Sequence, residues 1–122
     1  MAVTPGTYNM TVQRRADHSI QLVFKDSTNN AINLSGFFVA AQVWDKDRKV
    51  KFADWNVTYT NRATGTVDIA LTDVQTASFI PDSVLYYDVL LTDASGFKEY
   101  YLEGNINVSE GYTAWLLLML LN

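Results

Sequence analysis

The residue types that carry most enzymatic chemistry are scarce in this chain. Its 122 residues include no cysteine and one histidine, His18, which directly follows Asp17. A nucleophile needs a base beside it, so these two side chains are the first candidates for a dyad. Because His18 opens an alternating segment, a strand-end histidine is the better interpretation. The sequence also lacks a Gly-x-Ser-x-Gly elbow and a glycine-rich phosphate loop. We therefore predict a protein that is not an enzyme and has no catalytic residue.

Metal and cofactor sites are equally unsupported by the sequence. Zinc would require several histidine or cysteine ligands, which this chain does not have. Asp45 and Asp47 have the spacing of a calcium loop, but Arg48 and Lys49 follow them. Those two side chains put positive charge where further oxygen ligands should stand. We predict no metal and no cofactor.

The charge balance argues against nucleic acid as a partner. Nine Lys and Arg residues stand against thirteen Asp and Glu, which gives a formal net charge of -4. A nucleic-acid binder needs a concentrated basic face. The clusters Arg14-Arg15 and Lys46–Lys51 are small. They are typical of solvated loops, or of charged residues on edge strands that prevent pairing with another chain. The start of the chain lacks a signal peptide, and no segment approaches the ~20 apolar residues of a membrane helix. We expect a soluble chain without a membrane span.

Short alternating segments separated by turn residues dominate the chain. Apolar residues recur with period two in 7–13, 18–25, 67–71 and 84–92, and almost no helical period is present. Thr72 and Gln75 match a capping box, which predicts one short helical turn that carries the chain between sheets. Gly104, inside the last predicted strand, indicates a bulge or the close approach of another backbone. This pattern predicts an all-β sandwich of about seven strands.

The segment 37–45 is apolar on both of its faces. Phe37, Val39, Ala41 and Val43 alternate on one face, and Phe38, Ala40, Gln42 and Trp44 on the other. A central strand is covered on both faces. Either a loop or another subunit must therefore cover Phe38 and Trp44.

The last residues form an uninterrupted apolar run from Trp115 to Leu121. Such a run is an aggregation hazard when exposed, so it needs a cover. It either packs into the chain's own core or docks into a neighbour; a membrane anchor would need about twice this length. We predict a β-sandwich domain at 1–112 and an apolar docking tail at 113–122. The predicted interface residues are Phe38, Trp44, Trp115, Leu116, Leu117, Leu118, Met119, Leu120 and Leu121.

The aromatic residues leave a second kind of partner open. Aromatic side chains stack on sugars, although they also fill sandwich cores and subunit interfaces. A glycan therefore remains a possible ligand. The candidates are Trp44, Trp55, Trp115, Tyr100, Tyr101 and Tyr112.

The order of several short motifs resembles a phage virion family. The motifs are Leu22–Asp26 with an Asn-rich turn, Ala31–Phe37, Gln42–Trp44, Gly65–Thr72, Asp93–Gly96 and Tyr101–Val108. Together they resemble the N-terminal domain of phage baseplate upper proteins and the small stand-alone virion proteins related to it. The resemblance extends to about Tyr112.

This resemblance implies an immunoglobulin-like antiparallel β-sandwich that attaches receptor-binding or fibre proteins to a tail or baseplate. The expected function is a non-enzymatic structural component of a virion, assembled in the host cytoplasm. Its partners would be other virion proteins and further copies of itself in a symmetric assembly. The alternative is a carbohydrate-binding β-sandwich module for adsorption to a host surface. Because the chain lacks the helical and receptor-binding parts of baseplate proteins, the tail at 113–122 would take over the docking role.

Overall fold

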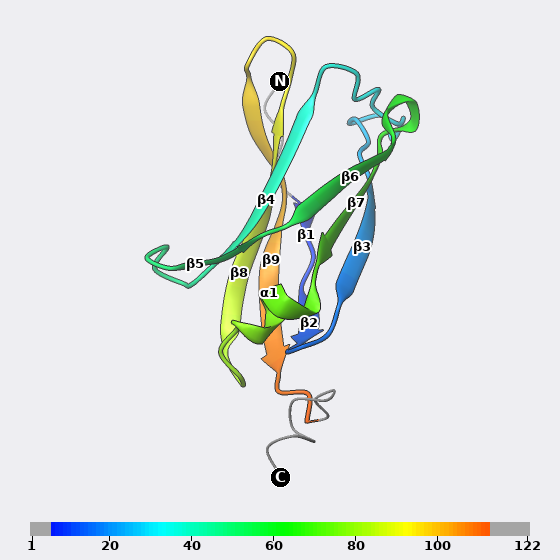
Figure 1. Ribbon diagram of the computed structural model, residues 1–122. Helices are drawn as coiled ribbons and strands as arrows, with labels where there is room; N and C mark the ends of the chain where they lie inside the picture. Colours follow the sequence, from blue (N-terminus) through cyan, green and yellow to red (C-terminus); the bar gives the residue numbers. More distant parts are fainter. Residues whose placement is uncertain (1–5, 113–122) are drawn as a thin grey trace.

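Two β-sheets packed face to face make up most of residues 6–112, the part of the chain that the computed structural model describes (Figure 1). The large sheet has the strand order β1-β9-β8-β4-β5 with β2 also on β9, and the small sheet has the order β3-β7-β6. The predicted all-β sandwich is confirmed. The strands are β1 Gly6–Thr7, β2 Met10–Gln13, β3 His18–Val23, β4 Phe38–Trp44, β5 Lys51–Asp54, β6 Asn56–Asn61, β7 Thr66–Leu71, β8 Val84–Thr92 and β9 Lys98–Ser109; the helical turns are η1 Arg62–Thr64 and α1 Asp73–Ala77.

The core lies between the sheets and follows the predicted alternation. On β4 the buried side chains are Val39, Ala41 and Val43, and on β8 every second residue from Leu85 to Leu91 is buried. Burying one large apolar side chain contributes about 1.5–3 kcal/mol, so these rows hold the two layers together.

A bend divides the run 51–61 between the two sheets. Strand β5 pairs with β4 in the large sheet, and β6 pairs with β7 in the small sheet. Between them Trp55 donates its backbone N–H to the Ala41 carbonyl at 2.9 Å, and its side chain is only 4% exposed. In the sequence, Phe52 is out of phase with the alternating Trp55, Val57 and Tyr59, which is typical of such a bend. Counting each broken run, β1–β2 and β5–β6, as one strand gives the predicted seven.

The predicted capping box is present at the start of α1. The Gln75 backbone N–H donates to the Thr72 hydroxyl at 3.2 Å, and the Thr72 N–H donates to the Gln75 Oε1 at 2.9 Å. These bonds satisfy amides that a helix start leaves unpaired. The turn then carries the chain from β7 in the small sheet to β8 in the large sheet, as expected.

The first strands pair with β9 in a parallel direction, an exception to the predicted antiparallel arrangement. Gly104 makes this edge possible. A Cβ at Gly104 would lie 1.9 Å from the Tyr8 carbonyl oxygen, so only glycine allows the backbone at Tyr8 to approach this closely. The Tyr87 hydroxyl donates to the same Tyr8 oxygen at 2.6 Å. The predicted close approach of another backbone at Gly104 is confirmed.

Replacing Gly104 should therefore loosen the β1–β2 edge. We expect Gly104→Ala to lower the free energy of unfolding by at least about 1–3 kcal/mol, the range for overpacking, in urea titrations followed by tryptophan fluorescence. Gly6→Ala is the matched control, because a Cβ there would meet its nearest atom at an ordinary 3.7 Å. Equal stability of the two variants would contradict the role assigned to Gly104.

Candidate interaction face

The surface of the large sheet that points away from the small sheet, here called the outer face, carries the predicted interface residues of β4. Side chains on this face alternate with the buried ones along each strand. Pairing between strands then sets which side chains stand in one row across the sheet. The outer-face residues of the three central strands include Phe38, Ala40, Gln42 and Trp44 on β4, Tyr86, Asp88 and Leu90 on β8, and Tyr100, Glu103 and Asn105 on β9.

Phe38 and Trp44 lie at opposite ends of the β4 row on the outer face. The Phe38 side chain is 67% exposed. The Trp44 side chain is half-buried, because its indole N–H donates to the Gln42 Oε1 at 2.9 Å and the Arg48 guanidinium lies 4.8 Å from the ring centroid. Within residues 6–112 the second apolar face of β4 thus keeps an uncovered end at Phe38. The other predicted interface residues, Trp115 to Leu121, lie outside the described residues.

Three further apolar side chains complete the outer face. Tyr86 stands beside Trp44, and Leu90 joins Ala40 and Tyr100 in the next apolar row. The sequence pattern could have placed Tyr86 and Leu90 on the outer face, because they alternate with the inward residues Tyr87 and Val89.

Tyr100 reaches this face only through a bulge. Val89 pairs with Leu102 and Leu90 pairs with Tyr100, so Tyr101 is an extra residue on β9. Strict alternation from Leu102 would have turned Tyr100 inward, whereas in the structure Tyr100 is 52% exposed and Tyr101 stacks on the buried Phe24. A bulge of this kind has no local signal in the sequence.

Two carboxylates stand side by side in the middle of the outer face. Asp88 on β8 pairs directly with Glu103 on β9, and Gln42 flanks Asp88 on β4. Burial raises the pKa of the half-buried Asp88, and the charge of Glu103 adds to this rise, while the charge of Arg48 opposes it. Like charges directly opposite each other destabilise a sheet, so this row carries an electrostatic cost.

Three of the sequence candidates for chemistry, Asp17, His18 and Asp45, make structural contacts. The Asp17 carboxylate accepts from the Asp73 N–H at 2.8 Å at the start of α1, and His18 packs its ring 6.2 Å from that of Trp55. The Asp45 carboxylate accepts from the backbone N–H groups of Lys49 and Val50 and so shapes the β4–β5 turn. Among the described residues no group of three or more His, Cys, Asp and Glu side chains could hold a metal ion.

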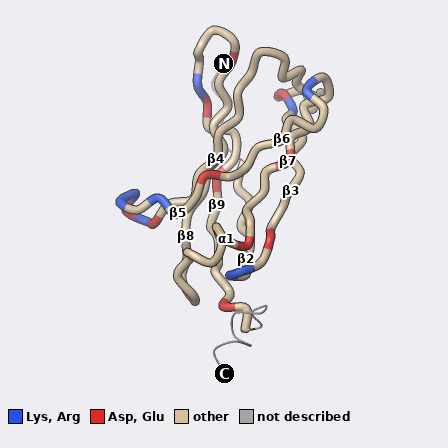
Figure 2. The backbone as a smooth tube through the Cα atoms, in the orientation of Figure 1, with Lys and Arg blue, Asp and Glu red and all other residues tan. Residues whose placement is uncertain are grey.

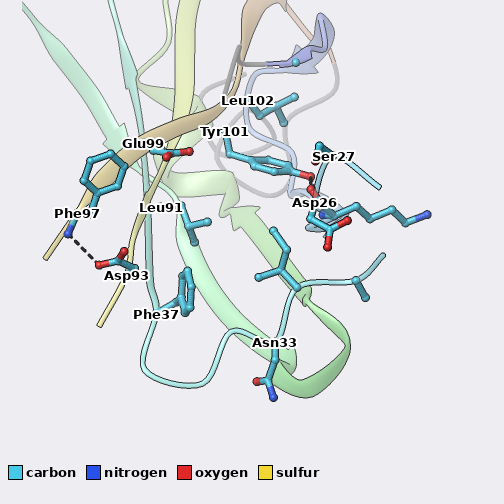
Figure 3. Close-up of a pocket in the computed structure, with 14 residues that line it drawn as sticks. Asp26, Ser27, Asn33, Phe37, Leu91, Asp93, Phe97, Glu99, Tyr101 and Leu102 are labelled. Carbon is cyan, nitrogen blue, oxygen red and sulfur yellow. Dashed lines mark hydrogen bonds between the residues drawn. The ribbon is translucent and has the colours of Figure 1, made fainter. Parts of the chain in front are cut away.

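A cleft of about 960 Å³ opens where the 25–37 loop meets the β8–β9 hairpin (Figure 3). Phe37 and Leu91 contribute apolar walls, and the carboxylates at its rim build turns. The Asp93 Oδ1 accepts from the backbone N–H groups of Ser95 and Phe97, and Asp26 does the same for Thr28 and Asn30. Hydrogen bonds, first from the Ser95 and Thr28 hydroxyls, lower the pKa of each carboxyl. Asp26 and Asp93 therefore act as turn formers.

Comparison with known proteins finds a similar solved structure but no matching sequence family. No protein-family model matches the chain, and no curated protein sequence matches it. Among solved structures, the filamin domain of Lin-41 is similar, with a TM-score of 0.47 and 17% identity over 83% of this chain and 84% of that chain. The two packed sheets by themselves make the chain an all-β sandwich protein. No helix within residues 6–112 is long and apolar enough to cross a membrane.

His18 should make the stability of the sandwich depend on pH. Burial lowers the pKa of His18 below its ordinary value of 6.5. The unfolded chain then binds a proton more readily than the folded chain, so stability falls as pH drops from 7 through about 6.5 toward the folded pKa. Urea midpoints measured from pH 7.5 to 5.5 should decline for the wild type and stay flatter for His18→Gln. Parallel declines would contradict this origin.

Proposed function

We propose that this chain is a non-enzymatic structural component of a phage virion, a tail, baseplate or fibre-attachment protein that acts through subunit–subunit contacts. The observation that carries the proposal is the apolar face around Phe38, which residues 6–112 leave uncovered, so that the Phe38 side chain is 67% exposed. Its partners are other virion proteins and further copies of the chain, and it is assembled into particles in the host cytoplasm. The resemblance of its motif order to baseplate upper proteins supports the same function.

The composition of the outer face supports an interface. Phe38, Tyr100 and Leu90 form an apolar group at one end of the sheet, and Trp44 with Tyr86 forms a second group. Aromatic residues are enriched at protein interfaces, and apolar area removed from water contributes roughly 25 cal/mol per Å². Because these side chains project from paired strands, the face is rigid and needs little ordering when a partner binds.

The tail at 113–122 is the second element of the proposal. It follows a fastened stretch, since the Glu110 carboxylate accepts from Arg14 at 2.7 Å and from Arg15 at 3.1 Å. The Arg15 guanidinium also donates to the Gly111 carbonyl. We propose that Trp115 to Leu121 dock into a neighbouring subunit from this anchored point.

Incorporation into particles tests the proposal. In a phage that carries Phe38→Asp, we expect quantitative mass spectrometry of purified particles to show at least about a tenfold loss of the chain, because a buried unpaired carboxylate is costly. Val74→Asp is the matched control, since Val74 is 76% exposed on α1 and lies off the outer face. Absence of the wild-type chain from particles, or equal incorporation of both variants, would overturn the proposed function.

A carbohydrate-binding module for host-surface adsorption is the second candidate. The observation in its favour is the presence of Trp44, Tyr86 and Tyr100 on one sheet face, as a glycan platform would require. Trp55 is excluded from such a platform because it lies in the core.

Glycan binding tests this second candidate. Glycan-array signals above background that Tyr100→Ala abolishes, and that Tyr112→Ala leaves unchanged, would favour the module. Tyr112 is the control because it is 87% exposed beyond the end of β9. We expect no such signal if the outer face serves protein contacts.

A further inference from the structure

Strand β3 forms an edge of the small sheet that has no strand partner within residues 6–112. The sheet order is β3-β7-β6, so β3 pairs with β7 on one side and is the outer strand (Figure 1). Directly beyond the paired residues, the Phe24 N–H donates to the Gly65 carbonyl at 2.8 Å. The backbone groups of successive residues point to opposite edges of an antiparallel strand. The N–H and C=O groups of Ser19, Gln21 and Val23 therefore point away from β7.

This edge lacks the protection that the outer strands β5 and β6 have. The six residues His18–Val23 include no proline and no Lys, Arg, Asp or Glu, and their register with β7 is continuous. In contrast, β5 has four residues and is flanked by its own Lys51 and Asp54, and β6 shifts register between Thr58 and Asn61. Figure 2 shows charged residues gathered in the β4–β5 turn, while β3 carries none. Charges, short strands and bulges keep an edge from pairing with another chain, so the β3 edge is open to an added strand.

The side chains along this edge form an incompletely covered row of the core. Ile20 and Leu22 point inward and pack against the core, yet both are only half-buried. Their cross-strand partners on β7, Ile69 and Val67, are completely buried. The difference arises because β7 has a strand on each side and β3 has a strand on one side. Apolar side chains of an added strand would cover Ile20 and Leu22 and remove that area from water.

The apolar tail starts from a point close to the beginning of β3. The chain is fastened at Gly111, because the Arg15 guanidinium donates to its carbonyl. Arg15 is three residues before His18, the first residue of β3. The connecting residues 112–114 span at most about 10 Å, so the tail can reach only an edge that lies near this point. The run Trp115–Leu121 has seven residues, and β3 has six.

The composition of the tail favours the edge of a neighbouring copy. Trp115–Leu121 is apolar at every position, so as a strand it would be apolar on both faces, as in a strand covered on both sides. One face would lie over Ile20 and Leu22. The other would continue the outer surface of the small sheet, where Ser19 and Gln21 are exposed within residues 6–112. A tail placed on a neighbouring copy holds its own sandwich against that copy, where it can cover this second face.

We propose that the tail of one copy adds as an outer strand to the free edge of β3 in a neighbouring copy of this chain. Backbone hydrogen bonds to the edge groups of β3 hold the tail, and its apolar side chains complete the cover of Ile20 and Leu22. This inference rests on the proposed function in taking 113–122 as a docking tail, and it names the site that receives the tail.

Disulfide crosslinking between full-length chains tests this site, because the chain has no cysteine of its own. A Gln21→Cys chain is mixed with variants that each carry one cysteine within positions 116–121. A disulfide needs Cα atoms about 4.4–6.8 Å apart, which neighbouring strands provide. Because side chains alternate along a strand, we expect linked heterodimers at alternate tail positions, with at least about five times the yield of the positions between them. Thr58→Cys, also exposed but on the far strand β6, is the matched control and should give no such pattern.

A chain that carries both cysteines shows which copy receives the tail. Gln21→Cys combined with the tail position of highest yield should give linked dimers and larger species, in a yield that rises with protein concentration. A linked monomer at every concentration, with no heterodimer from the mixed single variants, would place the tail on its own β3 and overturn the proposal. Equal yields at all tail positions, or equal yields with Thr58→Cys, would also overturn it, because they would show contact without strand pairing.

The result separates this inference from the proposed function. If no exchange of tails is found but Phe38→Asp still removes the chain from particles, the virion function stands and only the β3 site is wrong. If the tail links to Gln21→Cys of neighbouring copies but the wild type is absent from particles, the β3 site stands and the virion function falls.

Discussion

The pairing of β8 with β9 is the interaction on which the rest of this structure depends. It joins the two longest strands, and β9 uses its other edge to hold β1 and β2 in a parallel direction. At Gly104 the absent side chain admits the Tyr8 carbonyl, and Tyr87 from β8 bonds the same oxygen at 2.6 Å. One glycine on β9 thus couples the start of the chain to the centre of the large sheet.

The same pairing arranges both surfaces of the large sheet. Because Tyr101 is an extra residue on β9, two consecutive aromatic side chains point to opposite faces of the large sheet. The Tyr101 ring stacks on the buried Phe24 with the ring centroids 4.4 Å apart, while Tyr100 points outward. The Tyr101 hydroxyl also bonds the Lys25 backbone and so fastens the loop that borders the cleft. A single bulge therefore contributes to core packing, loop position and the composition of the outer face.

The features that set this protein apart lie on a surface. Its candidate chemical groups close turns or start a helix, as Asp17, Asp45 and Asp93 do. Its outer face, in contrast, combines an exposed phenylalanine, Phe38, with the adjacent carboxylates Asp88 and Glu103. Both features are costly for an isolated domain, because they leave apolar area in water and like charges together. A partner that covers the face would remove its apolar area from water, which is why the proposed function uses this face.

The amino-acid sequence was sufficient to predict the local features of the fold. Alternation predicted the inward residues of β4 and β8, the Thr72–Gln75 pair predicted α1, and Gly104 indicated the close approach of another backbone. These signals are local, because they reflect the geometry of a few adjacent residues. The three-dimensional arrangement of the strands was needed to show that Gly104 meets Tyr8, that Trp55 is buried, that Tyr100 points outward, and that Asp88 stands beside Glu103. Those facts depend on the register between strands far apart in the chain, which packing of the whole sandwich selects and no short pattern encodes.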